Sequence, residues 1–97
     1  MTHLTWEELK NILEVGTIIT GTIIRHEPYG AFVDIGYDYD GLIQITDFKD
    51  EGVMTPEEYP MVGEKVQVKI LGFKDHGCQV WLGIKPNQLK KAEKNNF

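Results

Sequence analysis

Five short segments of the chain alternate apolar and polar residues with a period of two, and this pattern limits the fold more than any other feature. Such alternation is typical of half-buried β-strands, and the segments are rich in the β-branched residues that favour strands. They cover residues 17–25, 31–35, 41–46, 64–73 and 78–84. Five short strands with tight turns and one long connection predict a small closed antiparallel barrel, which leaves no strand edge open.

Two interruptions of this pattern carry further expectations. Gly21 lies in the middle of the first predicted strand, and a glycine there predicts a bend or bulge. Residues 47–64 join the third and fourth strands and contain two prolines, two glycines and many acidic residues. A loop this long in a small domain is usually functional or a structured insertion, and its "PEEY" stretch predicts one helical turn.

A helix is predicted ahead of the barrel, in "TWEELKNIL". Thr5 and Glu8 have the spacing of a capping box, and Gly16 ends the helical pattern. The predicted apolar stripe consists of Trp6, Leu9, Ile12 and Leu13. The stripe is expected to cover the core, and the alternative is a helix that binds a partner. The expected organisation is an N-terminal helical extension over 1–14, a barrel over 15–85 and a polar, Lys-rich tail over 86–97.

Charge is distributed unevenly along the 97 residues, although they form a single domain by length. The formal net charge is −5, and residues 34–64 alone hold nine acidic groups and one basic group. Residues 65–97 hold seven basic and two acidic groups. A single cysteine excludes an internal disulfide, and neither a leader pattern nor a long apolar run occurs, so we expect a cytoplasmic protein.

Aromatic and amide residues share the outward side of the predicted strands. Asp34 marks the solvent side of the second strand, and Phe32 has the same parity. The other outward residues, with Tyr29 just before the strand, are Leu42, Gln44, Thr46, Gln79 and Trp81. Rings that stack and amides that donate and accept hydrogen bonds suit single-stranded nucleic acid. The alternative is an ordinary surface covered by the helix or the tail.

The stretches "VGTIITGTIIRHEPYGAFVDIGYDYDGLIQITDF" and "PMVGEKVQVKILGFKDHGCQVWLGIK" resemble the S1 domain, an RNA-binding module with the oligonucleotide-binding (OB) fold. The resemblance covers residues 15–85. It implies an all-β, five-stranded antiparallel Greek-key barrel with an RNA-binding face. The chain is also similar in size to small free-standing bacterial proteins of this family.

The resemblance implies roles for particular residues. Tyr29 and Phe32 match the two aromatics of the family's RNA face, and Gln44 stands where a His is usual. Asp75 is the acidic counterpart, although a longer turn could shift that position to Lys74. Gln79 replaces a frequent Arg or Lys, which removes a phosphate contact. Trp81 lies two residues further on the same face, and the expected RNA-binding set is Tyr29, Phe32, Gln44, Lys69, Lys74, Asp75, Gln79 and Trp81.

Lysines near the end of the chain add a possible path for phosphates. They are Lys65, Lys69, Lys74, Lys85, Lys90, Lys91 and Lys94. If they gather beside the aromatic face, they form a basic track. The alternative is a solvated, Lys-rich tail.

Residues for catalysis or metal binding are not apparent in the sequence. The chain has no serine, and Cys78 has no evident base partner. His76 and Cys78 supply two of the four ligands that zinc normally needs. We therefore expect no enzyme activity, no cofactor and no metal.

Two functions remain open from the sequence. The first is a monomeric protein that binds single-stranded or structured RNA with little sequence preference. The second is a protein-interaction module that docks on a ribosomal, transcription or RNA-decay complex through its acidic loop or its N-terminal helix.

Overall fold

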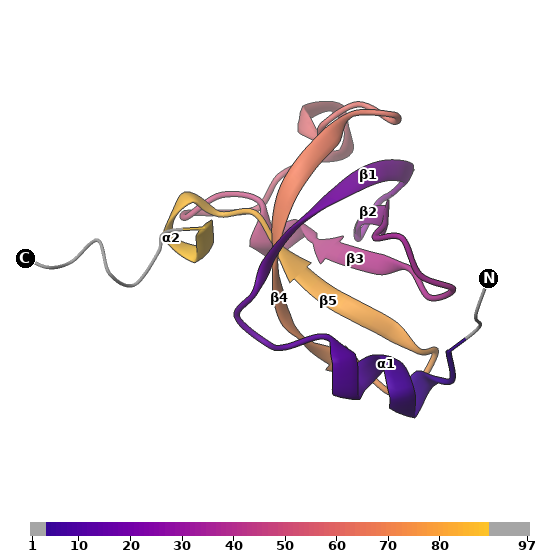
Figure 1. Cartoon of the computed structure of the whole chain (residues 1–97). Helices are drawn as coiled ribbons and strands as arrows, with labels where there is room; N and C mark the ends of the chain where they lie inside the picture. Colours follow the sequence, from indigo (N-terminus) through magenta and orange to yellow (C-terminus); the bar gives the residue numbers. More distant parts are fainter. Residues whose placement is uncertain (1–3, 90–97) are drawn as a thin grey trace, which may run out of the picture.

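Five strands form a closed barrel in the order β1-β2-β3-β5-β4, as the sequence predicts. The computed structural model describes residues 4–89 (Figure 1). In chain order the elements are α1 (Trp6–Ile12), β1 (Ile18–Glu27), β2 (Gly30–Asp34), β3 (Gly41–Gln44), the 3-10 turns η1 (Ile45–Asp47) and η2 (Pro56–Glu58), β4 (Lys65–Lys74), β5 (Gln79–Gly83) and α2 (Pro86–Leu89).

Four of the five strand pairings are antiparallel, and the pairing of β3 with β5 is parallel. An odd number of strands forces this result, because directions that alternate around a ring of five must repeat once. The predicted antiparallel barrel therefore needs one parallel pair, between Gly41–Ile43 and Val80–Leu82.

The two ends of the barrel are closed by different segments (Figure 1). Leu9 and Leu13 of the α1 segment join the core, so the expected role of the helix as a cover is confirmed. Phe48 and Tyr59 of the 47–64 loop also join the core and stack with ring centroids 4.8 Å apart. The loop is thus a structured insertion, held further by the hydrogen bond from the Tyr59 hydroxyl to the Glu27 carbonyl (2.8 Å).

Two β-bulges reverse the side-chain alternation along the neighbouring strands β1 and β4. The register shifts between Ile23 and Arg25 and again between Ile70 and Gly72. The predicted bend at Gly21 is therefore misplaced by three residues, to Ile24. Gly21 is needed for another reason, since a Cβ there would collide with the Val33 side chain.

Several local expectations are resolved by the structure. The capping box of Thr5 and Glu8 is present, and "PEEY" forms η2. Ile12 was expected in the buried stripe, but 55% of its surface is exposed, because the helix ends at this residue. The third strand is shorter than expected and continues as η1 from Ile45. Residues 90–97 of the predicted tail lie outside the described part.

Candidate nucleic-acid interface

One row of side chains crosses four of the five strands on the outside of the barrel, and the fifth strand contributes a glycine to it. The strand register aligns Arg25 with Phe32, Phe32 with Leu42, Leu42 with Trp81, and Trp81 with Gly72. Phe32 and Leu42 are buried, yet neither belongs to the core inside the barrel. The outward side of the sheet thus places three apolar side chains next to one another, with Arg25 at one end and Gly72 at the other, and we call this set of five residues the aromatic row.

Phe32 is only 5% exposed, so the expectation that it lies open to solvent is wrong. The Arg25 guanidinium lies 4.2 Å from the centre of the Phe32 ring, and Tyr29 meets this ring edge-on at 6.1 Å. An ion pair with Glu27 holds the guanidinium, with 2.8 Å between Nε and Oε2. The exposed stacking surfaces here are therefore Tyr29, which is 51% exposed, and Arg25 itself.

The structure brings most of the predicted site residues to this outer surface. Gln44 pairs with Gly30, directly after Tyr29, and Gln79 pairs with Lys74 two residues before Trp81. Both amides and Trp81 are partly exposed. The Lys74 ammonium donates to the His76 carbonyl at 2.6 Å, so it is bent toward the β4–β5 turn.

Lys69 shares the outward side of β4 but lies on the other side of the bulge. It pairs with Gly83 of β5, two residues beyond Trp81, and with Ile18 of β1. Lys69 is therefore a neighbour of the aromatic row at its Trp81 end.

Asp75 has a structural partner that the sequence did not reveal. One of its carboxylate oxygens accepts hydrogen bonds from the Trp6 indole and the Lys10 ammonium, both at 2.7 Å. The hydrogen bond from Lys10, followed by that from Trp6, holds the pKa of Asp75 below its ordinary value. Asp75 thus ties α1 to the β4–β5 turn, while Trp6 packs edge-on against Tyr39 and Phe73.

Arg25 is the member of this surface that sequence reasoning missed. A strict period of two puts Arg25 on the same side as the buried Ile23, which would bury its charge. That conflict was the available signal for a bulge between them. Leu42 was placed correctly on the outward side, but its part in the row follows only from the parallel pairing with Trp81.

Acidic groups lie close to one end of the row. Burial, helped by the nearby negative charge of Asp34, raises the pKa of Asp40, and the positive charge of Arg25 opposes this rise. Arg25 is therefore near two carboxylates, those of Asp40 and of its ion-pair partner Glu27. Of the predicted basic track, Lys90, Lys91 and Lys94 lie outside the described residues.

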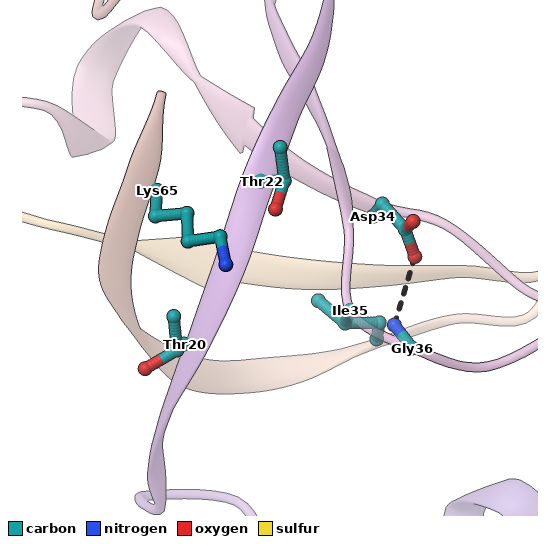
Figure 2. A pocket seen from close by; sticks show the side chains of 6 residues that line it. All are labelled: Thr20, Thr22, Asp34, Ile35, Gly36 and Lys65. Atoms are coloured by element: carbon teal, nitrogen blue, oxygen red, sulfur yellow. Dashed lines mark hydrogen bonds between the residues drawn. The ribbon is translucent and has the colours of Figure 1, made fainter. Parts of the chain in front are cut away.

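A shallow pocket of about 250 Å³ lies beside the row, over the middle of β1. Figure 2 shows its lining residues, which come from β1, from the end of β2 and from the start of β4. They are Thr20, Thr22, Asp34, Ile35, Gly36 and Lys65. Within residues 4–89, no cluster of three or more His, Cys, Asp or Glu side chains is arranged to hold a metal ion. No helix in the same range is long and apolar enough to cross a membrane.

A closed five-stranded barrel with this strand order and an amphipathic outer face defines an OB-fold domain. The chain also matches the family model of the S1 RNA binding domain over residues 12–85. Because the match covers more than half of the chain, the chain belongs to the S1 RNA-binding domain family.

Comparison with individual proteins agrees with this assignment. The small ribosomal subunit protein bS1 of Streptococcus pneumoniae is 37% identical over 73 residues, which cover 75% of this chain and 18% of that protein. The bS1 protein of Staphylococcus epidermidis is 40% identical over the same shares. The chain therefore spans less than a fifth of these relatives.

Solved structures show the same fold. GSP13 from Bacillus subtilis has a TM-score of 0.69 and 30% identity, over 88% of this chain and 65% of that one. In an a/eIF2alpha-aDim2p-rRNA complex from Pyrococcus horikoshii, a chain superposes with a TM-score of 0.67 at 21% identity, over 78% of this chain and 48% of that one. At this identity the second likeness describes the fold alone.

Proposed function

We propose that this protein binds single-stranded RNA, or single-stranded parts of structured RNA, with little sequence preference. The observation that carries the proposal is the aromatic row, which includes the partly exposed Trp81 and lies beside the exposed Tyr29. Membership of the S1 RNA-binding domain family supports it. Stacking accepts every base because every base has a flat π-face, so a face built on stacking selects weakly among sequences.

The outer surface suggests a division of roles. Bases would stack on Tyr29, on Trp81 and on the Arg25 guanidinium, which Phe32 supports from below. The amides of Gln44 and Gln79 would bond to base or sugar edges. Lys69 and Lys74 would contact phosphates. Asp75 is already engaged with α1, so we assign it to positioning the helix and the turn.

Tyr29→Ala provides the clearest test of this face. Loss of one stacking partner should weaken binding to a fluorescent RNA 12-mer by about 1–3 kcal/mol, measured by anisotropy at low salt. Tyr29 is half exposed, so the fold should survive the change. Tyr37→Ala is the matched control, since Tyr37 is also exposed but lies in the β2–β3 loop.

A folded Tyr29→Ala protein with unchanged RNA affinity would refute the role of Tyr29. A wild-type protein that binds neither this 12-mer nor a hairpin RNA at low salt would refute the proposed function. Equal losses in the Tyr29 and Tyr37 variants would mean that aromatic content, rather than the row, determines binding.

A protein-docking function is the second candidate, and one surface favours it. Met61 and Val62 are 73% and 58% exposed at the tip of the turn before β4. They lie within the acidic 47–64 segment, whereas most of the α1 stripe is used inside the molecule. A partner that stays bound to the wild-type chain after ribonuclease treatment, but not to Met61→Gln, would support docking here.

We also propose that the domain acts as a binding module without enzyme activity, in the cytoplasm and as a monomer. S1-family membership and the aromatic row both describe a surface for recognition. Sedimentation of the purified chain would test the monomer, because a stable dimer would double the measured mass.

A further inference from the structure

The pocket over β1 is too small for a whole small-molecule ligand but suits part of one. Pockets that hold complete ligands usually measure about 300–1,000 Å³, against about 250 Å³ here. Figure 2 shows the Lys65 side chain extending to β1, between Thr20 and Thr22, with Asp34 on the other side of this strand. A sugar with its attached phosphate is a fragment of suitable size.

The polar groups of the pocket have unused hydrogen-bonding capacity. Within residues 4–89, the Lys65 ammonium and the hydroxyls of Thr20 and Thr22 form no hydrogen bond or ion pair with another side chain. Oδ1 of Asp34 accepts a hydrogen bond from the Gly36 amide at 2.8 Å, which fixes the carboxylate and leaves Oδ2 for a ligand. The pocket thus offers a cation, two hydroxyls and an oriented carboxylate.

These groups favour a ligand that carries both phosphate oxygens and a hydrogen-bond donor. An ammonium and a hydroxyl donate to phosphate oxygens, whereas a carboxylate only accepts and therefore requires a donor such as a hydroxyl. A bare anion is disfavoured, because the Asp34 carboxylate in the pocket and the nearby Asp40 carboxylate would both repel it. A phosphate joined to a sugar hydroxyl satisfies both ends of the pocket.

The pocket adjoins the proposed RNA face. Asp34 lies two residues after Phe32 on the outward side of β2, which is a step of about 6.6 Å along a strand. In the pairing of β1 with β2, Asp34 is opposite Thr22 and Phe32 is opposite Arg25. Thr22 in turn pairs with Lys65 of β4. One strand of RNA whose bases stack on the aromatic row can therefore place its backbone over the pocket.

We propose that the pocket binds the ribose and phosphate of one RNA nucleotide, an inference that rests on the proposed function. Lys65 and Thr22 contact the phosphate, and Asp34 accepts a hydrogen bond from the ribose 2′-hydroxyl. Because DNA lacks this hydroxyl, the pocket gives the domain a preference for RNA that the aromatic row cannot supply.

The test compares anisotropy titrations of a 12-nucleotide oligo(A) in its RNA and DNA forms. We expect the wild type to bind the RNA about tenfold more tightly, as one hydroxyl–carboxylate hydrogen bond implies. Asp34→Asn should lower this RNA/DNA ratio, because a neutral amide bonds a hydroxyl more weakly than a carboxylate does, while keeping an acceptor for the Gly36 amide. Glu51→Gln is the control, since it removes one negative charge from the exposed loop and should leave the ratio unchanged.

Lys65→Gln tests the phosphate end. It should weaken binding of both oligonucleotides and reduce the slope of log affinity against log salt by about 0.7, the value for one phosphate contact on a single strand. Lys49→Gln carries the same charge change and should leave the slope unaltered, because Lys49 lies beside Glu58 in the acidic loop.

The possible outcomes distinguish a failure of the pocket assignment from a failure of the proposed RNA-binding function. An unchanged RNA/DNA ratio in folded Asp34→Asn, or an unchanged slope in Lys65→Gln, would overturn the pocket assignment while Tyr29→Ala still reports on the row. Equal wild-type affinity for RNA and DNA would also overturn it. If the wild type binds neither oligonucleotide, the pocket assignment falls together with the proposed function.

Discussion

At the scale of single residues, Phe32 shows how one side chain can belong to a surface without being exposed. Its ring lies outside the barrel core, but Arg25, Tyr29 and Leu42 surround it. A ring covered in this way contributes to packing and also supports the proposed stacking surface. We therefore expect substitutions at Phe32 to change both stability and RNA binding, and substitutions at Tyr29 to change RNA binding alone.

We predict that Phe32→Ala lowers the free energy of unfolding by about 3 kcal/mol, the lower end of the range for Phe→Ala at buried sites. The flexible side chains of Arg25 and Tyr29 can partly close the space, which keeps the cost at this end. Urea denaturation followed by circular dichroism measures the change. Tyr29→Ala should cost within about 0.5 kcal/mol, and similar losses for the two variants would contradict the buried placement of Phe32.

At the scale of elements, α1 is attached to the barrel by two kinds of contact. Leu9 and Leu13 enter the core, while Trp6 and Lys10 bind Asp75 in the β4–β5 turn. The first contact follows from the apolar stripe of the sequence. The second joins residues far apart in the chain, so no periodicity could reveal it.

The contact between α1 and the turn should weaken in acid. Hydrogen bonds from Lys10 and Trp6 lower the pKa of Asp75 from its ordinary value of 3.8, so the contact is fully present above pH 3.8. It is lost as the pH falls through the lowered pKa, when the carboxylate gains a proton. The NMR signal of the Trp6 indole N–H, followed from pH 6 downward, should shift only in that lower window.

Asp75→Asn is the control for this titration. Asparagine keeps an oxygen acceptor but cannot titrate, so the acid-dependent shift of the Trp6 signal should disappear. A midpoint above pH 3.8 in the wild type would show that the contact does not stabilise the charged carboxylate.

The strand pattern was sufficient to predict the barrel, because long parts of each strand keep a period of two. The bulges at Ile24 and Leu71 each insert one residue into the alternation. The first left a signal, since a strict period puts the charge of Arg25 on the core side, whereas the apolar Leu71 gave none. Of the expected site, the sequence placed Tyr29, Gln44, Gln79 and Trp81 on one side of the sheet. It missed Arg25, and it could not show that Phe32 is covered or that Asp75 has partners.

At the scale of the whole molecule, the acidic and basic groups are unevenly distributed. The 47–64 loop contains most of the acidic groups of the central segment and closes one end of the barrel. Lys65, Lys69 and Lys74 follow one another along β4. In the proposed mode of binding, an RNA strand on the outer face would meet these three lysines despite the net charge of −5.

This arrangement predicts a modest dependence of RNA binding on salt. Three phosphate contacts on a single strand imply a slope of about −2 for log affinity against log salt. Anisotropy titrations of the RNA 12-mer between low and physiological salt measure this slope. A slope near zero would exclude the lysine contacts, and a value near −5 would require further cations.

The parallel pairing of β3 with β5 also determines when the barrel can form. Gly41 must find Val80, and the whole of the 47–64 loop and β4 separates them in the chain. Contacts between such distant residues form slowly, because loop closure costs entropy before any contact repays it. We therefore expect the two distant pairings, of β3 with β5 and of β1 with β4, to form after the local hairpins. Until then these strands present open edges to neighbouring chains, and a growing polypeptide is exposed to aggregation until β5 has been synthesised.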